Sequence, residues 1–254
     1  MYLPSIHAEE HIPSLREFIR ANPLGILTTA IDSQTYPTIQ SSHIPFILDI
    51  KDENDEAELG TLRGHMARAN PQTKAMIENV TEGPSKETLP RLEKEVMVLF
   101  NGPVQHYVTP KFYKETKPAT GKTVPTWDYS AVQVYGKATI FFDSKDPATD
   151  VFLSKQLSDL SLFGETQIMG YDKPWQTSDA PTAYIDLRKK AIIGIQIDVE
   201  RMGGKWKMNQ ESGEGDREGV IEGFQALGTE VGDAMAKCVK ERAEIAAAKK
   251  RAAS

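Results

Sequence analysis

The sequence has little cysteine, no long apolar run and no excess of positive charge. Its single cysteine, Cys238, excludes an internal disulfide and a cysteine-rich zinc module, and it favours a reducing, intracellular compartment. No run of about eighteen consecutive apolar residues occurs, so we expect no membrane span. The net charge of −6 argues against a non-specific grip on nucleic acid, because such binding needs a basic face.

Several catalytic signatures are also missing. The chain has no Gly-x-Gly-x-x-Gly, no phosphate loop ending in Gly-Lys-Ser/Thr and no Gly-x-Ser-x-Gly elbow. His43, His65 and His106 lie far apart and lack the spacing of zinc ligands, so we expect no metal site. The N-terminus lacks the basic and apolar regions of a signal peptide, which predicts a cytoplasmic location, with the nucleus as the alternative. No residue is identified as catalytic.

Hydrophobic periodicity and turn residues predict an α+β fold that is mainly antiparallel β. About seven short strands are interspersed with helices that do not alternate with them one to one, which favours an antiparallel barrel with peripheral helices. We expect a main domain over residues 1–228 with a surface insertion near residues 81–95, followed by a C-terminal helical tail over residues 229–254. Residues 191–202 and 206–209 predict a hairpin that turns at Gly203-Gly204.

Residues 60–72 form a polar stretch between two apolar, β-like segments. Arginine forks match phosphate oxygens, and glycine lets the backbone approach a ligand closely. The composition therefore indicates an anion site, while a solvated helix start whose arginines face water fits it equally well. The polar side chains are Arg63, His65, Arg68, Asn70 and Gln72.

The local pattern also makes a geometric prediction for the two arginines of this stretch. Residues 59–62 are expected to form a short strand, and residues 65–79 a helix. Arg63 then closes the strand and Arg68 belongs to the helix. The two side chains can converge on one anion only through a turn at Gly64.

Three later stretches mix aromatic with polar side chains. Trp127 and Tyr129 are two residues apart, so on a strand they share a face, where core packing is the ordinary interpretation and stacking on a planar ring is the other. Lys205 and Lys207 alternate in the same way; they would point to solvent, or suit a phosphate or a flavin carbonyl oxygen. The stretches are residues 101–113, 123–129 and 204–210.

Taken together, these stretches resemble the PaiB-like proteins, a family of FMN-binding negative transcriptional regulators. The resemblance covers residues 1–225, and the motifs stand in the family's order. They are Met1-Tyr2-Leu3-Pro4, Ser42-His43-Ile44-Pro45-Phe46, the segment 64–72, Phe100-Asn101-Gly102-Pro103, Tyr107-Val108-Thr109-Pro110, the segment 124–129 and the segment 205–210.

The resemblance implies an FMN-binding split barrel, the fold of pyridoxamine-phosphate oxidases, in a homodimer with FMN in a cleft between subunits. It implies that the 60–72 stretch and the Ser42-His43 strand lie by the phosphate, and that aromatic residues lie near the ring or the dimer seam. The cofactor-binding residues expected on this basis are Ser41, Ser42, His43, Arg63, His65, Arg68, Asn70, Tyr113, Trp127, Lys205, Lys207 and Gln210.

The sequence departs from the family in places and leaves the activity open. The family commonly has Asn where Asp128 stands, and Ser-Gln-Asn where Asn209-Gln210-Glu211 stands. One hypothesis is flavin-dependent redox on a small-molecule ligand. A second is a regulator that binds DNA or a partner protein, supported by the basic Lys249-Lys250-Arg251 tail. A third is haem binding or breakdown through His43, His65 or His106.

Overall fold

The structure, a computed structural model, describes residues 1–82 and 90–252 and divides into two units. Unit 1 comprises Met1–His11, Asn101–Val132 and Gly203–Ser254, and unit 2 comprises Ile12–Phe100 and Gln133–Met202.

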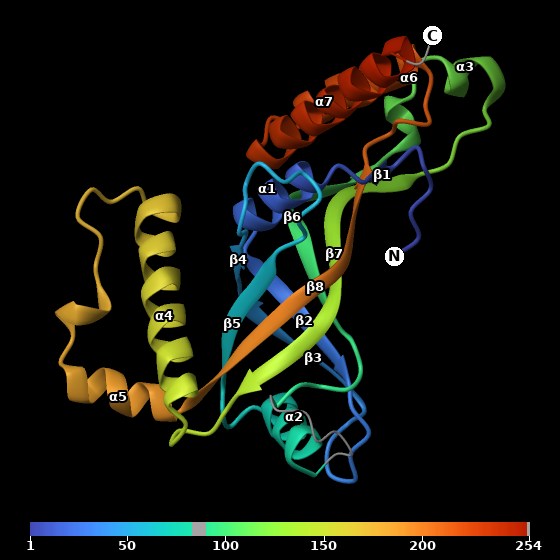
Figure 1. Cartoon of the computed structure of the whole chain (residues 1–254). Coiled ribbons are helices and arrows are strands. Elements are labelled where there is room, and N and C mark those ends of the chain that lie inside the picture. Colours follow the sequence, from blue (N-terminus) through green and yellow to red (C-terminus); the bar gives the residue numbers. More distant parts are fainter. Residues whose placement is uncertain (83–89, 253–254) are drawn as a thin grey trace. The chain divides into compact units, whose positions relative to one another are not determined.

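Antiparallel strands and peripheral helices make up both units (Figure 1). The strands are β1 (Ala8–Glu9), β2 (Leu24–Ala30), β3 (Ile39–Pro45), β4 (Ile47–Asp49), β5 (Thr61–Ala67), β6 (Val96–Val108), β7 (Thr126–Phe141) and β8 (Ile192–Lys207). The helices are α1 (Ile12–Ala21), α2 (Pro71–Glu82), α3 (Thr116–Thr120), α4 (Pro147–Phe163), α5 (Thr182–Lys190), α6 (Glu214–Gln225) and α7 (Glu230–Ala252), with short turns η1 (Pro110–Phe112), η2 (Gly164–Ile168) and η3 (Thr177–Asp179).

The sheet of unit 2 curls back on itself. Its strands follow the order β3-β2-β6-β7-β8-β5-β4, and the two end strands, β3 and β4, are separated along the chain by Phe46 alone. Backbone pairing joins β3 to β2 and β4 to β5. Residues of β3 also contact β5, so the two ends of the sheet lie close together. The predicted α+β fold with a mainly antiparallel sheet is confirmed, and its barrel is split rather than closed.

Apolar side chains fill the inside of this curled sheet, and two helices pack against it. Helix α1 contributes Leu15 and Ile19, and α2 contributes Ala75 and Met76, all of them buried. Gln72, at the start of α2, donates from Nε2 to the Leu27 and Gln40 carbonyls and to Thr29 Oγ1, so it ties the helix to β2 and β3. The sheet adds Leu27, Phe46, Leu62, Val98, Phe100, Val134, Ile193, Ile195 and Ile197.

Helix α4 covers the outer face of β5 and β8 (Figure 1). Its Phe152 stacks on Phe141 of β7 with ring centroids 4.1 Å apart. A Cβ atom at Gly194 of β8 would stand 2.3 Å from the Phe152 ring, so the glycine lets the helix approach the strand. This packing places the inner half of α4 directly over the β5 side chains that face outward.

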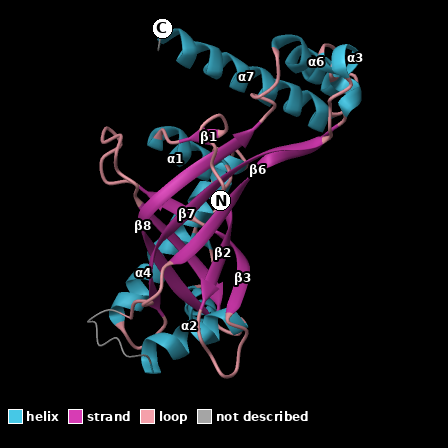
Figure 2. Cartoon of the chain, turned by 90° about the vertical axis from the view of Figure 1, so that its right-hand side faces the viewer, coloured by secondary structure: helices cyan, strands magenta, loops and turns pink. Residues whose placement is uncertain are grey.

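Unit 1 contains one end of each of β6, β7 and β8, together with β1 and the helices α3, α6 and α7. Strand β1 pairs with β8 through Ala8 and Lys205, and α6 packs against α7 (Figure 2). Phe224 of α6 is buried against Phe112 and His106. Helix α7 continues to Ala252, and the side chains of Lys249 and Lys250 lie outside the described part.

The predicted hairpin at Gly203-Gly204 is wrong. Strand β8 runs without interruption through both glycines, and neither has the positive φ that a two-residue hairpin turn requires. Gly203 instead leaves room for Leu3, whose Cδ1 would stand 2.9 Å from a Cβ atom.

The predicted insertion near residues 81–95 lies partly outside the described residues. Among the helices of residues 1–82 and 90–252, none combines the length and the apolar composition that a membrane span needs.

Candidate functional site

The split in the barrel brings together residues that the sequence places far apart. Asn70, which precedes α2, donates from Nδ2 to Ser42 Oγ of β3 at 3.0 Å. Strand β5 contacts β3 and carries His65, whose side chain lies on the outer face of β5 because its neighbours Gly64 and Met66 face the core. We call this region the β3–β5 seam and define it by Ser41, Ser42, His43, His65 and Asn70.

Neighbouring residues of β3 present their side chains to opposite faces of the sheet. Ser42 pairs with buried Leu27 of β2 and shares its face, while Ser41 pairs with Thr28 on the outer face. The Ser41 and Thr28 hydroxyls are hydrogen-bonded at 2.9 Å. His43 lies on the outer face as well and is exposed. The seam therefore offers an open surface with two hydroxyl groups and an imidazole. The pairing through Thr28 was not anticipated from the sequence.

His65 carries an unsatisfied polar atom at this seam. Its Nδ1 is buried and makes no hydrogen bond within the described part of the chain. Burial lowers the pKa of the imidazole below its usual value, so the ring is neutral at pH 7 and offers one donor and one acceptor. A flavin edge presents alternating carbonyl oxygens and ring nitrogens, and such a group suits this combination of imidazole and hydroxyls. The seam residues fit a flavin by their donor set.

Arg63 is held by acidic side chains. Its Nη2 lies 2.9 Å from Asp49 Oδ1 and 2.6 Å from Asp159 Oδ2, its Nε also donates to Asp49, and its Nη1 donates to Gln156 Oε1 at 3.2 Å. The side chain is 6% exposed. Burial lowers the arginine pKa, but the bonds to both carboxylates outweigh it and raise the pKa. Two carboxylates neutralise this guanidinium, and it joins β4, β5 and α4.

The predicted turn at Gly64 and the helix from residue 65 are wrong. Strand β5 continues to Ala67, and α2 begins at Pro71. Arg68 follows the strand, and its guanidinium donates to the backbone carbonyls of Lys190 and Phe142. The two arginines therefore share no hydrogen-bond partner and do not converge on one anion.

Five predicted cofactor residues belong to unit 1. Trp127 is half exposed and donates from Nε1 to Gln105 Oε1 at 2.9 Å, while Tyr113 donates to Asn209 Oδ1 at 3.5 Å. Lys205 Nζ lies 5.5 Å from the Tyr129 ring centre. The Gln210 side chain is bonded to the backbone of Met208 and Trp206, and Lys207 belongs to the cluster described next.

A buried carboxylate forms a separate polar cluster in unit 1. Asp128 is fully buried; Lys207 Nζ lies 3.5 Å from its Oδ1, and Asn209 donates to its Oδ2. Burial raises the pKa of Asp128 to about 6, against the opposing effects of Lys207 and Asn209. Lys207 also approaches Glu211, which accepts from His7 at 2.9 Å. The sequence signalled Asp128 only as a departure from the family pattern.

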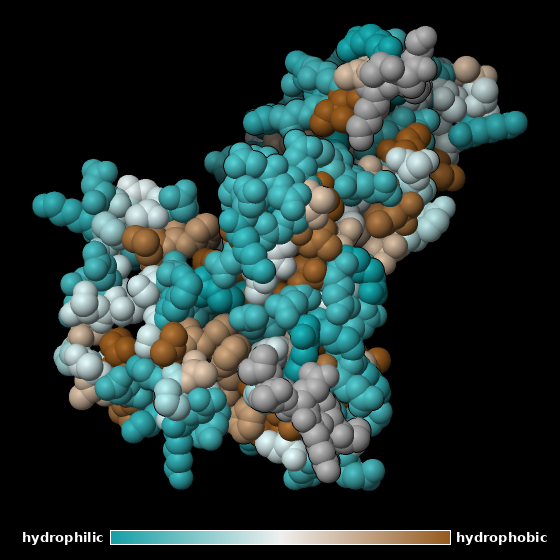
Figure 3. All heavy atoms as spheres, viewed as in Figure 1, coloured by the Kyte–Doolittle hydropathy of each residue, from teal (hydrophilic) through white to brown (hydrophobic). Residues whose placement is uncertain are grey.

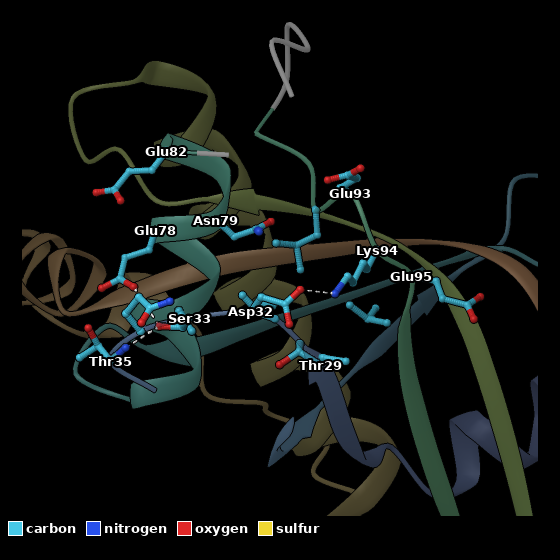
Figure 4. Close-up of a pocket in the computed structure, with 16 residues that line it drawn as sticks. Thr29, Asp32, Ser33, Thr35, Glu78, Asn79, Glu82, Glu93, Lys94 and Glu95 are labelled. Atoms are coloured by element: carbon cyan, nitrogen blue, oxygen red, sulfur yellow. Dashed lines mark hydrogen bonds and ion pairs between the residues drawn. The ribbon is translucent and has the colours of Figure 1, made fainter. Parts of the chain in front are cut away.

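The cavity of about 530 Å³ shown in Figure 4 lies between the start of the β2–β3 loop, α2 and the start of β6. Its one lysine, Lys94, is paired with Asp32 at 2.7 Å. The excess of negative charge makes this cavity unsuitable for a phosphate. The lining carboxylates are those of Asp32, Glu78, Glu82, Glu93 and Glu95. In the residues that the structure describes, no cluster of three or more His, Cys, Asp or Glu is placed to hold a metal ion.

Comparisons with known proteins identify the family of the chain. Residues 1–201 match the family described as "Putative FMN-binding domain". The chain is similar to an uncharacterised protein of Aspergillus fumigatus, with 59% identity over 96% of this chain and 98% of that protein. It is 25% identical to the Bacillus subtilis protease synthase and sporulation protein PAI 2, over 89% of each. A flavocytochrome structure from Azotobacter vinelandii is similar at a TM-score of 0.42 with 11% identity, covering 82% of this chain and 73% of that one.

Proposed function

This chain belongs to the FMN-binding domain family, and we propose that it binds FMN at the β3–β5 seam of unit 2. The observation that carries the proposal is the buried Nδ1 of His65 on the outer face of β5, which has no hydrogen-bond partner among the described residues; the Ser42–Asn70 bond joins β3 to the segment that follows β5. A buried polar atom without a partner costs stability, and a ligand that satisfies it recovers that cost. The family match supports a flavin over a haem.

The seam residues would hold the cofactor in distinct ways. Ser41 and His43 lie on the open outer face, where a hydroxyl and an imidazole can bond the polar edge or the phosphate of FMN. Neutral His65 would bond one ring atom, and Asn70 would fix the Ser42 hydroxyl. FMN itself would supply hydride or single-electron transfer when bound. Arg63 has no part in this proposal, because Asp49 and Asp159 neutralise it.

A homodimer is the second part of the proposal. Past Leu153 and Gln156, the α4–α5 segment has no buried residue, and Figure 3 shows apolar side chains scattered over its surface. Apolar area of this kind marks contact surfaces in many proteins. The exposed residues include Leu162, Ile168, Met169, Tyr171 and Leu187. A second copy of the chain would cover part of this surface.

The biological role follows from the flavin in one of two ways. As an oxidoreductase, the protein would transfer electrons between the flavin and a small molecule. As a regulator, it would respond to the flavin and bind DNA or a partner protein, which is the role that the resemblance to the PaiB-like family implies. Oxidation of a reduced nicotinamide nucleotide by the FMN-loaded protein would favour the first. Salt-dependent retention on DNA, lost on deleting residues 240–254, would favour the second.

Absorbance and fluorescence of the purified protein test the FMN proposal, and sedimentation tests the dimer. We expect one FMN per chain, with a flavin absorbance band and quenched flavin fluorescence. We expect the protein to sediment as a dimer. A protein that shows no flavin band and leaves the fluorescence of added FMN unchanged would contradict the cofactor proposal. Sedimentation as a monomer with FMN bound would contradict the dimer alone.

A further inference from the structure

A second concave site in unit 2 lies where the end of β5 meets the start of α4 and the end of α5. Its volume is about 310 Å³, and Arg68, Ser144, Lys189 and Lys190 are among its lining residues. None of the lining residues belongs to the β3–β5 seam. Ligand pockets commonly measure about 300 to 1,000 Å³, so this one suits a small ligand better than a nucleotide. We call it the Arg68 pocket.

The Arg68 pocket carries a net positive charge. Lys189 Nζ lies 2.6 Å from Asp150 Oδ1 and 3.1 Å from Asp186 Oδ1, so these two carboxylates compensate that lysine. Arg68 and Lys190 form no ion pair within residues 1–82 and 90–252. The three cations Arg68, Lys189 and Lys190 stand against two carboxylates, and in a chain of net charge −6 this local net charge of +1 favours an anion.

Arg68 is also held in position before any ligand arrives. Its Nε donates to the Lys190 carbonyl at 3.3 Å, and its Nη2 donates to the Phe142 carbonyl. A guanidinium has five N–H donors, so Nη1 and one hydrogen of Nη2 stay available. Because the backbone already fixes the side chain, a ligand loses less conformational entropy when it binds there.

We propose that the Arg68 pocket binds a small oxyanion of the phosphate-monoester class. Arg68 would offer two parallel donors to the phosphate oxygens, as guanidinium groups do, and Lys190 would add a point charge. The Ser144 hydroxyl would supply a further donor at the rim. The site stands apart from the proposed FMN site and carries its own ligand.

Calorimetric titration of the full chain with inorganic phosphate tests the pocket. We expect Arg68→Gln to weaken phosphate binding roughly tenfold and Lys190→Gln roughly threefold. Lys74→Gln removes the same charge from exposed α2 and should leave the affinity within about twofold of the parent. Because the Lys190 ammonium makes no hydrogen bond or ion pair within the described part of the chain, its variant should keep the parent's melting temperature. Equal phosphate affinity in the parent, Lys190→Gln and Lys74→Gln would overturn the proposal.

A second titration separates this anion from the FMN phosphate. In FMN-saturated protein we expect the phosphate affinity to stay within about twofold of the flavin-free value. Loss of phosphate binding on loading FMN would overturn the separate site, because the pocket would then hold the FMN phosphate. If the protein takes up no FMN, the seam proposal fails, while the phosphate titration still decides on the Arg68 pocket.

Discussion

Arg63 and Arg68 lie five positions apart in one segment of chain, but their guanidinium groups have different kinds of partner in unit 2. Arg63 lies under α4, where Asp49 and Asp159 cancel its charge. Arg68 is held by two carbonyl oxygens, which orient the guanidinium and leave its charge in place. An arginine in a polar motif can therefore bind an anion only if the fold places no carboxylate against its guanidinium. The residues next to it in the sequence do not determine whether a carboxylate lies there.

Replacing Arg63 should have the largest effect on stability. Arg63→Ala removes the arginine partner of Asp49, leaves Asp159 with Lys155 alone, and removes the bond to Gln156. Because both carboxylates keep partial access to water, we expect a loss at the lower end of the range for a buried pair, about 3 kcal/mol. Urea unfolding at pH 7 measures the loss. Lys155→Ala removes only an exposed pair with Asp159 and should cost less than about 0.5 kcal/mol. An Arg63→Ala protein as stable as Lys155→Ala would show that Arg63 is not a structural clamp.

Asp128 extends the comparison from arginines to a buried carboxylate, whose partner Lys207 Nζ lies 3.5 Å from its Oδ1. Asp128→Asn removes that charge and keeps the shape of the side chain, and we expect it to stabilise the protein at pH 7. The pKa of about 6 in the folded state, against 3.8, corresponds to about 2 to 3 kcal/mol. Thermal melting of the parent and Asp128→Asn at pH 7 measures the gain.

The pH dependence of that gain has a defined sign. The folded state holds the Asp128 proton more tightly, so the protonated carboxyl favours folding below about pH 4. This contribution is lost as the pH rises through about 6. Asp128→Asn should therefore match the parent near pH 4 and exceed it at pH 7. A variant that is less stable than the parent at pH 7 would show that the Lys207 pair outweighs the burial.

Arg68→Ala should have the smallest effect on stability. It removes hydrogen bonds to two carbonyls near the protein surface, where water can replace the donors, and costs about 1 kcal/mol. The same urea experiment compares it directly with Arg63→Ala. If Arg68→Ala unfolds as readily as Arg63→Ala, the contrast between a clamped and an available guanidinium does not hold.

The sequence predicts the fold class better than the details of the 60–72 stretch. Leu62, Gly64 and Met66 alternate with Arg63 and His65, and this period of two marks β5 as a strand through Ala67. The polar composition after residue 64 favours a helix, but the alternation outweighs it and the strand continues. At Gly203-Gly204 the dipeptide favours a turn, but the pairing of β8 with its neighbours keeps the strand extended.

The partners of the two arginines could not be predicted from local sequence. Asp159 stands 96 positions after Arg63, and only the packing of α4 on β5 brings them together. The Lys190 carbonyl is 122 positions from Arg68. By contrast, the sequence predicts Ser42, His43 and Asn70 as cofactor-binding residues. The fold joins Ser42 to Asn70 by a hydrogen bond across the split in the barrel.

Titration of FMN against seam variants tests the central proposal most directly. Ser41→Ala combined with His43→Ala removes two exposed polar groups from the outer face of β3 without touching the core. We expect this variant to bind FMN at least about tenfold more weakly than the parent, and Lys74→Gln to bind it as the parent does. A double variant that binds FMN as tightly as the parent would contradict a flavin site at the β3–β5 seam.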